Sequence, residues 1–412
     1  MDNATYPGRG KVAVVRTSPE TVLDDYARLI ELVGFREILP QAHKTLLKIN
    51  ISWQTWYPAC STTPWQLEGV IRPLQEAGYD LLGVHNDTVV VDTGDGETNN
   101  KQRYVTDKYD VPCAYIYKPE VPWIPYEPQR PFLVLDDIYP DGVRIPAILP
   151  GNNIIQLPTV KTHVFTTITG AMKNAFGGLL GRKRHWTHSE IHETLVDLLM
   201  IQQDIHPGLL AVMDGTFAGD GPGPRAMHWH EKNVLLASAD QVAIDATSAM
   251  LQGFEPLDIP FLRIAHEMGL GVADPNEITF VGDVDVTEER WNFNVDDTFA
   301  SRGQKMIYHG ALKPFEGLLL RSPIVPWSYF ASNFYHNVYW YPVVGRKRVE
   351  AALDTPWGEL FQQYGAEAGL EGAVLPSVET KTVLQGAAAL AGLAAVVGGG
   401  VAALSALARS HD

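Results

Sequence analysis

The feature that most constrains the fold is a repeated alternation of short apolar runs with longer segments of helical periodicity. The apolar runs have the length and composition of buried strands, at residues 11–16, 45–51, 80–84, 153–157, 209–213, 233–237 and 278–281. Segments typical of helices follow several of these runs. Strands that alternate with helices usually pair in parallel through right-handed crossovers. The sequence therefore predicts an α/β fold with a mostly parallel sheet and helices on both faces.

Polar residues gather in one otherwise apolar stretch, residues 157–178. Lys161 and His163 follow the predicted strand at 153–157. Ligand sites of open α/β sheets lie at the edge where the strands end. The stretch therefore predicts a site at that edge of the sheet.

The second half of this stretch predicts a helix over residues 166–176. In a helix, Gly170, Lys173, Asn174 and Gly177 would share one face, because they recur at spacings of three and four. Glycines allow a ligand to approach the backbone closely, and the lysine and amide donate hydrogen bonds. This face is therefore predicted to bind an anion together with Lys161.

Four further polar residues lie in or beside predicted strands and helices. Lys48 and Asn50 alternate along the predicted strand 45–51, so they share one face of it. Asp214 follows the predicted strand 209–213, where it would orient a base, serve as a base or cap a turn. Asp245 lies in an apolar helix and needs a partner, for which Lys161 and Lys173 are candidates, so it is predicted to join the substrate-binding residues of the site.

These motifs together resemble the family known as domain of unknown function 362. The resemblance rests on four ordered motifs: Lys48-Ile49-Asn50 with Ser61-Thr62-Thr63-Pro64, Lys161-Thr162-His163 with Lys173-Asn174-Ala175-Phe176-Gly177, Asp214-Gly215 with Gly219-Asp220-Gly221-Pro222-Gly223-Pro224, and Ala237-Ser238-Ala239-Asp240 with Val242-Ala243-Ile244-Asp245-Ala246. Ile49 and Gln241 stand where the family pattern has proline. The resemblance covers roughly residues 10–283 and implies an architecture rather than a defined reaction.

Charge and cysteine content narrow the classes of partner and cofactor. The formal net charge of −16 argues against nucleic acid, which requires a cationic surface. Relatives in the resembled family often carry cysteine-rich ferredoxin-like segments, but this chain has only Cys60 and Cys113, so no iron–sulfur cluster is expected. Two cysteines in a long chain without an amino-terminal secretory signal indicate a reduced, cytoplasmic compartment.

Three histidines raise the alternative of a metal site. His185 precedes a predicted helix that begins near Thr187, and His188 and His192 would lie four residues apart on one face of it. That spacing suits a transition metal, but the helical zinc motif is absent, and a histidine-bearing helix cap is the simpler interpretation. The neighbouring residues 182–184 are all basic and would attract an anionic ligand toward the site.

Two other segments are predicted to contribute less to the chemistry. The loop at residues 92–97 contains glycine and aspartate, the usual turn residues, and predicts a solvated turn rather than a phosphate-binding loop. Residues 111–150 combine short strands with many prolines, which predicts a hairpin-rich insertion.

The carboxy-terminal part differs from the rest in composition. We expect an α/β domain at residues 1–300, an aromatic-rich extension at 301–380 and an apolar helix at 383–408. The last stretch has 26 residues without a charge, enough to span a bilayer. The aromatic extension is typical of either a membrane interface or a clamp on the main domain. We predict a single-pass anchor at the cytoplasmic face of a membrane.

The combined prediction is a membrane-tethered enzyme that acts on an anionic, amphipathic small molecule. Lysines and asparagines would bind the anion, and His163 would transfer a proton with Lys173 and Asp214 beside it. One alternative is a non-catalytic, tail-anchored protein that binds or assembles a membrane complex, with the polar cluster as a structural network. The other is a metal-dependent enzyme using the region of His163, His188 and His192. The sequence carries no nucleotide-binding motif that would specify a cofactor.

Overall fold

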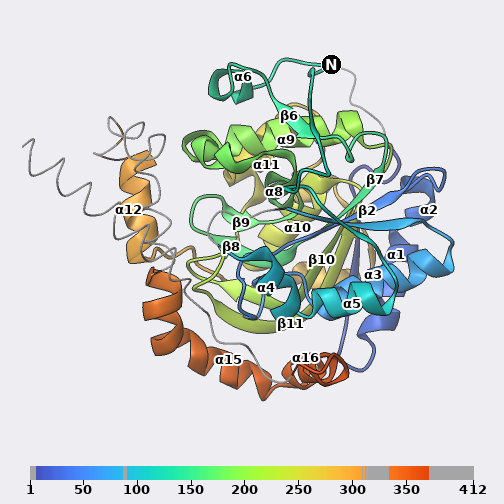
Figure 1. Cartoon of the computed structure of the whole chain (residues 1–412), viewed down its shortest axis with the longest axis vertical. Coiled ribbons are helices and arrows are strands. Elements are labelled where there is room, and N and C mark those ends of the chain that lie inside the picture. Colours follow the sequence, from blue (N-terminus) through green and yellow to red (C-terminus); the bar gives the residue numbers. More distant parts are fainter. Residues whose placement is uncertain (1–5, 87–90, 309, 311–312, 314–333, 371–412) are drawn as a thin grey trace, which may run out of the picture. The chain divides into compact units, whose positions relative to one another are not determined.

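The computed structural model describes residues 6–86, 91–308, 310, 313 and 334–370. They form a large sheet covered by helices (Figure 1). The strands of this sheet are β1 Lys11–Arg16, β2 Thr45–Ile49, β3 Leu81–His85, β4 Cys113–Tyr115, β7 Asn153–Leu157, β8 Thr159–His163, β9 Thr167–Thr169, β10 Leu209–Asp220, β11 His228–Ser238 and β12 Thr279–Gly282.

The sheet is mixed but mostly parallel, as the alternating pattern predicts. Its order is β12-β1-β11-β10-β7-β2-β3-β4, with β8 beside β10 and β9 beside β8. The pairs from β10 through β7, β2 and β3 to β4 are all parallel, and so is the pair of β1 with β12. The long strand β11 pairs antiparallel with both β10 and β1. The parallel half therefore places the ends of β2, β3 and β7 along one edge.

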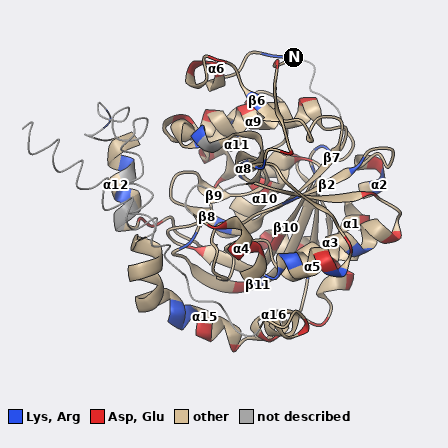
Figure 2. Ribbon diagram, in the orientation of Figure 1, with Lys and Arg blue, Asp and Glu red and all other residues tan. Residues whose placement is uncertain are grey.

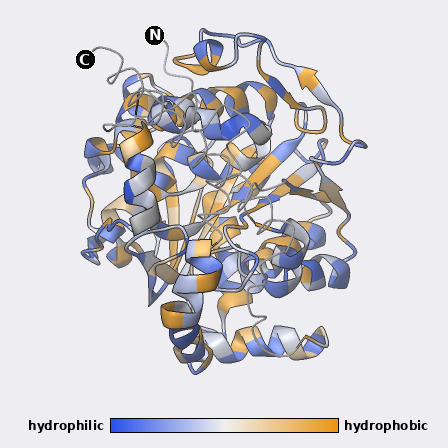
Figure 3. Ribbon diagram, turned by 60° about the vertical axis from the view of Figure 1, so that its left-hand side comes forward, coloured by the Kyte–Doolittle hydropathy of each residue, from blue (hydrophilic) through white to orange (hydrophobic). Residues whose placement is uncertain are grey.

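Helices cover both faces of the sheet, which confirms the predicted α/β class. On one face lie α1 Val22–Val33, α3 Pro64–Glu76 and α5 Gln102–Lys108, which pack on each other (Figure 1). On the other lie α9 Ile191–Ile205, α10 Gln241–Gln252 and α11 Pro260–Glu267. The strands are strongly hydrophobic and the helices amphipathic (Figure 3), so the core lies between the sheet and each helical layer.

Helix starts follow the capping chemistry of the sequence. Thr63 and Gln66 form a reciprocal capping box at the start of α3, with Pro64 in the first helical position. Asp240 caps α10 by accepting the N–H groups of Val242 and Ala243. Both starts depend on a side chain that bonds to the first turn of its own helix, whereas α1 Val22–Val33 begins without a side-chain cap.

The helix predicted over residues 166–176 is wrong. The segment contains the strand β9 and two one-turn helices, α7 Ala171–Asn174 and α8 Phe176–Leu179. Thr167 has a positive φ of 65°, which turns the chain from β8 into β9, and Gly170 is fully extended. The four residues expected on one helix face therefore do not share one.

The turn predicted at residues 92–97 is also wrong. Asp92 accepts the N–H of Asp95 and caps α4 Thr93–Asn99. A Cβ at Gly96 would lie 2.7 Å from Cγ2 of Ile51, so this glycine permits close packing rather than a turn. The glycine and aspartate content therefore predicted a solvated turn where the structure has a packed helix.

Several remaining elements complete the part that carries the site. Residues 111–150, predicted as a hairpin-rich insertion, contain one short antiparallel pair of strands with a long connection that includes a one-turn helix. The further elements are α2 Phe35–Ile38, β5 Trp123–Pro125, α6 Leu135–Ile138, β6 Arg144–Pro146, the 3₁₀ helices η1 Arg182–Glu190, η2 Pro256–Asp258, η3 Pro275–Glu277 and η4 Val284–Glu288, and the helices α15 Arg346–Leu353 and α16 Pro356–Glu367.

The chain divides into two compact units. The first unit comprises Met1–Asp297 and Gly345–Leu375. Within it, α16 packs on the sheet domain through a stack of Phe361 on Trp56, with ring centroids 4.1 Å apart. The Tyr364 hydroxyl also donates to the buried Glu68 carboxylate.

The second unit comprises Thr298–Val344 and Pro376–Asp412. Its described elements are α12 Phe299–Tyr308 and a π-helix that begins at Phe334 and ends at Gly345. Among the helices of the described ranges, none has the length and apolarity to cross a membrane. The predicted anchor at residues 383–408 lies outside these ranges.

Candidate functional site

A cavity of about 290 Å³ opens at the edge where the parallel strands end. Lys48 lies in β2, Asn86 follows β3 and Pro158 follows β7, so three adjacent strands contribute to it. The hairpin of β8 and β9, α7, η1 and the segment after β10 complete the wall. The position is the one that open α/β sheets commonly use for ligands.

The cavity is lined by cationic side chains. Its ionisable lining residues are Lys48, Lys161, Lys173, Arg184, Arg225, His163, His185 and His188. Among the described residues, no aspartate or glutamate lines it. Acidic residues lie instead on outer helices such as α2, α6 and α16 (Figure 2). The cavity thus concentrates positive charge in a chain of net charge −16.

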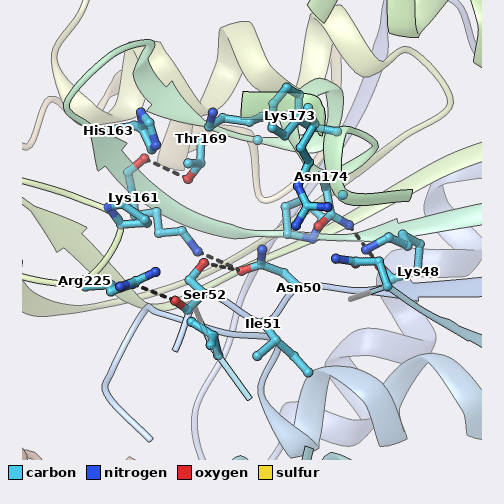
Figure 4. Close-up of a pocket in the computed structure, with 18 of the residues that line it drawn as sticks. Lys48, Asn50, Ile51, Ser52, Lys161, His163, Thr169, Lys173, Asn174 and Arg225 are labelled. Atoms are coloured by element: carbon cyan, nitrogen blue, oxygen red, sulfur yellow. Dashed lines mark hydrogen bonds between the residues drawn. The ribbon is translucent and has the colours of Figure 1, made fainter. Parts of the chain in front are cut away.

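Lys161 is held at the cavity wall by three hydrogen bonds. Its Nζ donates to Oδ1 of Asn50 at 2.9 Å (Figure 4). It also donates to the carbonyl of Cys60 and to Oγ1 of Thr159, both at 2.8 Å. Burial lowers the pKa of Lys161 to about 8. The three hydrogen bonds engage the donors of Lys161, which was predicted to bind the anion, within the protein.

Asn50 and Arg225 face the same part of the cavity. Oδ1 of Asn50 accepts from Lys161 and from the Ser52 hydroxyl, so its amide nitrogen remains to donate to a ligand. Nε of Arg225 donates to the Ser52 carbonyl at 2.9 Å. Its two terminal nitrogens form no hydrogen bond within the described chain, which leaves the fork that binds carboxylate or phosphate.

Lys48 is buried, with 2% of its surface exposed, and has no carboxylate partner among the described residues. Its Nζ donates one hydrogen bond, to the carbonyl of Ile49 at 2.7 Å. Burial, assisted by the positive charge of Arg184, lowers the pKa of Lys48 to about 7. This amine is therefore partly neutral at neutral pH.

Lys173 is the least constrained lysine of the cavity. Its Nζ lies 5.3 Å from the Phe176 ring centroid and makes no hydrogen bond to the residues that the structure describes. Burial and the charge of Lys161 lower the pKa of Lys173 to about 8. An anion that entered the cavity would raise the pKa of Lys173 again and so favour its charged form.

His163 lies at the wall in a defined tautomer. Its Nδ1 accepts the N–H of Phe165 at 3.1 Å, so the proton of the neutral ring lies on Nε2. In this state the ring donates a hydrogen bond and is not set up to accept a proton. The predicted role of His163 in proton transfer therefore requires a change of tautomer.

The three other histidines do not converge on a metal. His185 and His188 line the cavity, whereas His192 stacks on Phe261 with centroids 6.0 Å apart and does not line it. Burial, then the charge of Lys173, lower the pKa of His188 to about 3, so it is neutral. The described residues contain no cluster of histidine, cysteine and carboxylate ligands able to hold a metal.

Asp214 lies away from the cavity, contrary to its predicted role beside His163. It lies inside the long strand β10 rather than at a strand end, because β10 continues its pairing with β11 to Asp220. Its carboxylate accepts hydrogen bonds from the side chains of Tyr26, Thr63 and Trp65 and from Thr216. Asp214 therefore joins β10 to α1 and α3.

Asp245 also has a different partner from the predicted lysines. Its carboxylate accepts the N–H groups of Ala171 and Met172, at 2.6 and 3.1 Å, and thereby fixes the start of α7. A Cβ at Gly170 would lie 2.0 Å from Oδ1 of Asp245, so this contact requires glycine. Burial raises the pKa of Asp245 to about 7.

Asn174 likewise holds the fold together. Its amide nitrogen donates to the carbonyl of Lys48 and to Oε1 of Gln156, both at 2.9 Å. These bonds tie α7 to β2 and β7. Asn174 thus lines the cavity while its nitrogen, predicted to orient a ligand, is engaged by the protein.

Sequence reasoning missed Arg225, which directly follows the loop of glycines and prolines at 219–224. The loop approaches β8 so closely that a Cβ at Gly223 would lie 1.9 Å from the carbonyl oxygen of Thr162. The Thr162 hydroxyl in turn donates to the carbonyl of Gly221 at 2.7 Å. The sequence feature that could have identified Arg225 as a site residue is its position directly after this loop.

The fold and site define an α/β protein with a cationic cavity at the edge of a mostly parallel sheet. The chain belongs to the family described as domain of unknown function (DUF362), whose sequence profile matches residues 45–250. It is similar to the thylakoid-associated protein sll1697 of Synechocystis sp. (strain ATCC 27184 / PCC 6803 / Kazusa), with 31% identity over 134 residues. The alignment covers 31% of this chain and 40% of that protein, less than two thirds of its length. No solved structure matches the chain significantly.

Proposed function

We propose that the cavity binds a small molecule carrying a phosphate or carboxylate group. The observation that carries this proposal is the gathering of five lysines and arginines around about 290 Å³, without a carboxylate among the described lining residues. Such an arrangement is costly in an empty cavity, because like charges are gathered there and partly desolvated. An anionic ligand supplies the missing countercharge.

The individual groups suggest how the anion is held. The terminal nitrogens of Arg225 suit two oxygens of one phosphate or carboxylate, and Lys173 contributes a point charge. The amide nitrogen of Asn50 adds a directional donor. The volume is at the lower end of the range for small-molecule pockets, so the ligand is compact or only its anionic end enters.

We further propose that Lys48 exchanges a proton with the bound ligand. Proton transfer is most effective when the pKa of the group lies near the working pH, and that of Lys48 is about 7. His163 serves in this scheme as a hydrogen-bond donor through Nε2. The role first predicted for His163 and Asp214 thus passes to Lys48.

Association with a membrane is a separate part of the proposal. The related cyanobacterial protein is named thylakoid-associated, and residues 383–408 of this chain carry no charge. Fractionation of cells that express the chain with and without residues 381–412 tests this part. Recovery of both forms in the soluble fraction would contradict it.

Calorimetric titration with inorganic phosphate, pyrophosphate and succinate at pH 7 tests the anion site. Arg225→Gln removes two charge-assisted donors, so we expect affinity for the best ligand to fall about tenfold or more. Arg263→Gln, at an exposed pair on α11, removes the same charge elsewhere and is the matched control. Equal binding by wild type and Arg225→Gln, or saturable binding of none of the three anions, would refute the proposal.

The pH dependence of binding gives a second test. Lys48, Lys161 and Lys173 have pKa values of about 7 to 8 in the free protein, and an anion favours their charged forms. Binding above pH 8 should therefore take up protons, and affinity should fall as the pH rises. Titrations in two buffers of different ionisation enthalpy measure this uptake.

A further inference from the structure

A second cluster of reactive side chains lies at the edge strand of the sheet. Cys113 begins β4, the last strand on one side, and pairs with Gly83 of β3. His85 lies two residues beyond Gly83 on the same face of β3. Because Gly83 has no side chain, the side chains of Cys113 and His85 can both approach its Cα closely.

The geometry shows how closely the two side chains approach. A Cβ at Gly83 would lie 2.8 Å from Sγ of Cys113 and 3.0 Å from Nε2 of His85. Both atoms therefore converge on one point. His85 is only 1% exposed, and its Nε2 has no hydrogen-bond partner in the described chain. Cys113 itself is partly exposed, and its thiol donates to the carbonyl of Val111 at 3.7 Å, so the thiol proton must leave this contact before it passes to His85.

Glu97 of α4 fixes the other side of the His85 ring. Its Oε1 lies 2.6 Å from Nδ1 of His85, and its Oε2 accepts from Arg103 at 3.3 Å and from the Tyr115 hydroxyl at 3.2 Å. A carboxylate at Nδ1 holds the proton there, which leaves Nε2 of the neutral ring as a base directed toward Cys113.

The charged groups around the ring favour its protonated form. Burial opposes the charge of the imidazolium, but the Cys113 thiol and the Glu97 carboxylate outweigh burial and raise the pKa of His85 to about 9. Arg103 reaches only the far oxygen of Glu97. The order of Cys113, His85 and Glu97 is thus that of a thiol, a base and a group that orients the base.

From this convergence we propose that Cys113 is a reactive thiol and a site of covalent modification by low-molecular-weight disulfides. The thiol proton passes to Nε2 of His85, and the imidazolium is stabilised by Glu97. The thiolate attacks one sulfur of the disulfide, a new S–S bond forms, the old one breaks, and the released thiolate takes up a proton. The disulfide is the oxidant, so the step is balanced.

Cys60 provides a contrast within the same chain. It is fully buried, and its Sγ donates to the carbonyl of Pro224 at 3.2 Å. Burial raises the pKa of the Cys60 thiol, which disfavours the thiolate. The two cysteines of the chain should therefore react at very different rates.

The test is the reaction of the full chain with 4,4′-dithiodipyridine at pH 6, followed through the released thiopyridone. His85 supplies a base beside the thiol, and His85→Asn removes that base. A positioned base commonly accelerates a proton transfer by about tenfold or more, so we expect wild type to react about tenfold faster than His85→Asn.

Four variants make the result decisive. Cys113→Ser should remove the fast phase, and mass spectrometry should place the label on Cys113. Glu97→Gln and Gly83→Ala should slow the reaction without removing the thiol or its base, which keeps the proposal testable if His85→Asn fails to fold.

The pH profile separates a functional base from a structural histidine. Between pH 6 and 8 the rate of His85→Asn should rise about tenfold per pH unit, as for an ordinary thiol, and the wild-type rate should rise less steeply. Equal rates and parallel profiles in wild type, His85→Asn and Gly83→Ala would overturn the proposal. So would preferential labelling of Cys60.

Discussion

Replacement of Lys48 by methionine should stabilise the protein while it weakens anion binding. Lys48 is buried without a carboxylate partner, so the folded protein bears the cost of its desolvated charge. Methionine has a similar length and no charge. Replacement of a residue that serves ligand binding rather than folding should raise stability and weaken binding.

The magnitude follows from the pKa of Lys48. An unperturbed lysine has a pKa of 10.5, and in the folded protein that of Lys48 is about 7. The difference corresponds to about 5 kcal/mol at most, since one pKa unit is worth about 1.4 kcal/mol. At pH 7, where the folded amine is half neutral, about 4 kcal/mol of that cost remains. Loss of the hydrogen bond to Ile49 offsets about 1 kcal/mol, so we expect a net gain of about 3 kcal/mol.

The sign of the pH dependence provides the sharper test. Below pH 7 the lysine is protonated in both states, and its full cost is present. Between pH 7 and 10.5 the unfolded chain binds one more proton than the folded protein, so wild-type stability rises with pH. The advantage of Lys48→Met should therefore shrink by about 2 kcal/mol between pH 7 and pH 9.

Urea unfolding monitored by tryptophan fluorescence at pH 7, 8 and 9 measures both quantities. Lys347→Met, at an exposed position of α15, is the control and should change stability little at any of these pH values. A destabilised Lys48→Met protein, or a stability difference independent of pH, would refute the reasoning and favour a structural role for Lys48.

Two further substitutions test residues that the structure places outside the ligand site. Asp214→Ala leaves donors from Tyr26, Thr63 and Trp65 without an acceptor, so unfolding free energy should fall by about 3 kcal/mol or more while anion affinity stays unchanged in titrations. Gly170→Ala forces a Cβ against the Asp245 carboxylate and should cost about 2 kcal/mol or more in urea unfolding, whereas Gly303→Ala, with open space around it, should not destabilise.

The order of strands and helices was largely predictable because it depends on local pattern. Apolar runs such as 153–157 and 45–51 correspond to β7 and β2 within a few residues. Thr63 and Asp240 indicate where α3 and α10 begin, because a capping side chain bonds to backbone groups only two or three residues away. The predictions failed where glycine content was ambiguous, as at residues 92–97 and 166–176.

The composition of the site was predictable only in part. Lys48, Lys161 and Lys173 were recognised because cations are unusual in an apolar stretch, and the structure brings all three to one cavity. Asp214 and Asp245 were equally unusual, yet they bond to other groups. The sequence shows that a buried polar group needs a partner, but it does not show which partner the packing supplies.

The sequence by itself thus determined the α/β class, the main helix starts and the cationic character of one strand edge, since periodicity and capping act over a few residues. Only the tertiary structure decided that Arg225 lines the same cavity as Lys161 and that Asp214 does not. The strand β10 is longer than predicted and holds Asp214 within the strand, where it bonds to α1 and α3. The tertiary structure also brought Cys113 beside His85, 28 residues apart, through the register of two parallel strands and the missing side chain of Gly83. Such contacts depend on which elements pack together, and that is set by the whole core rather than by any local pattern.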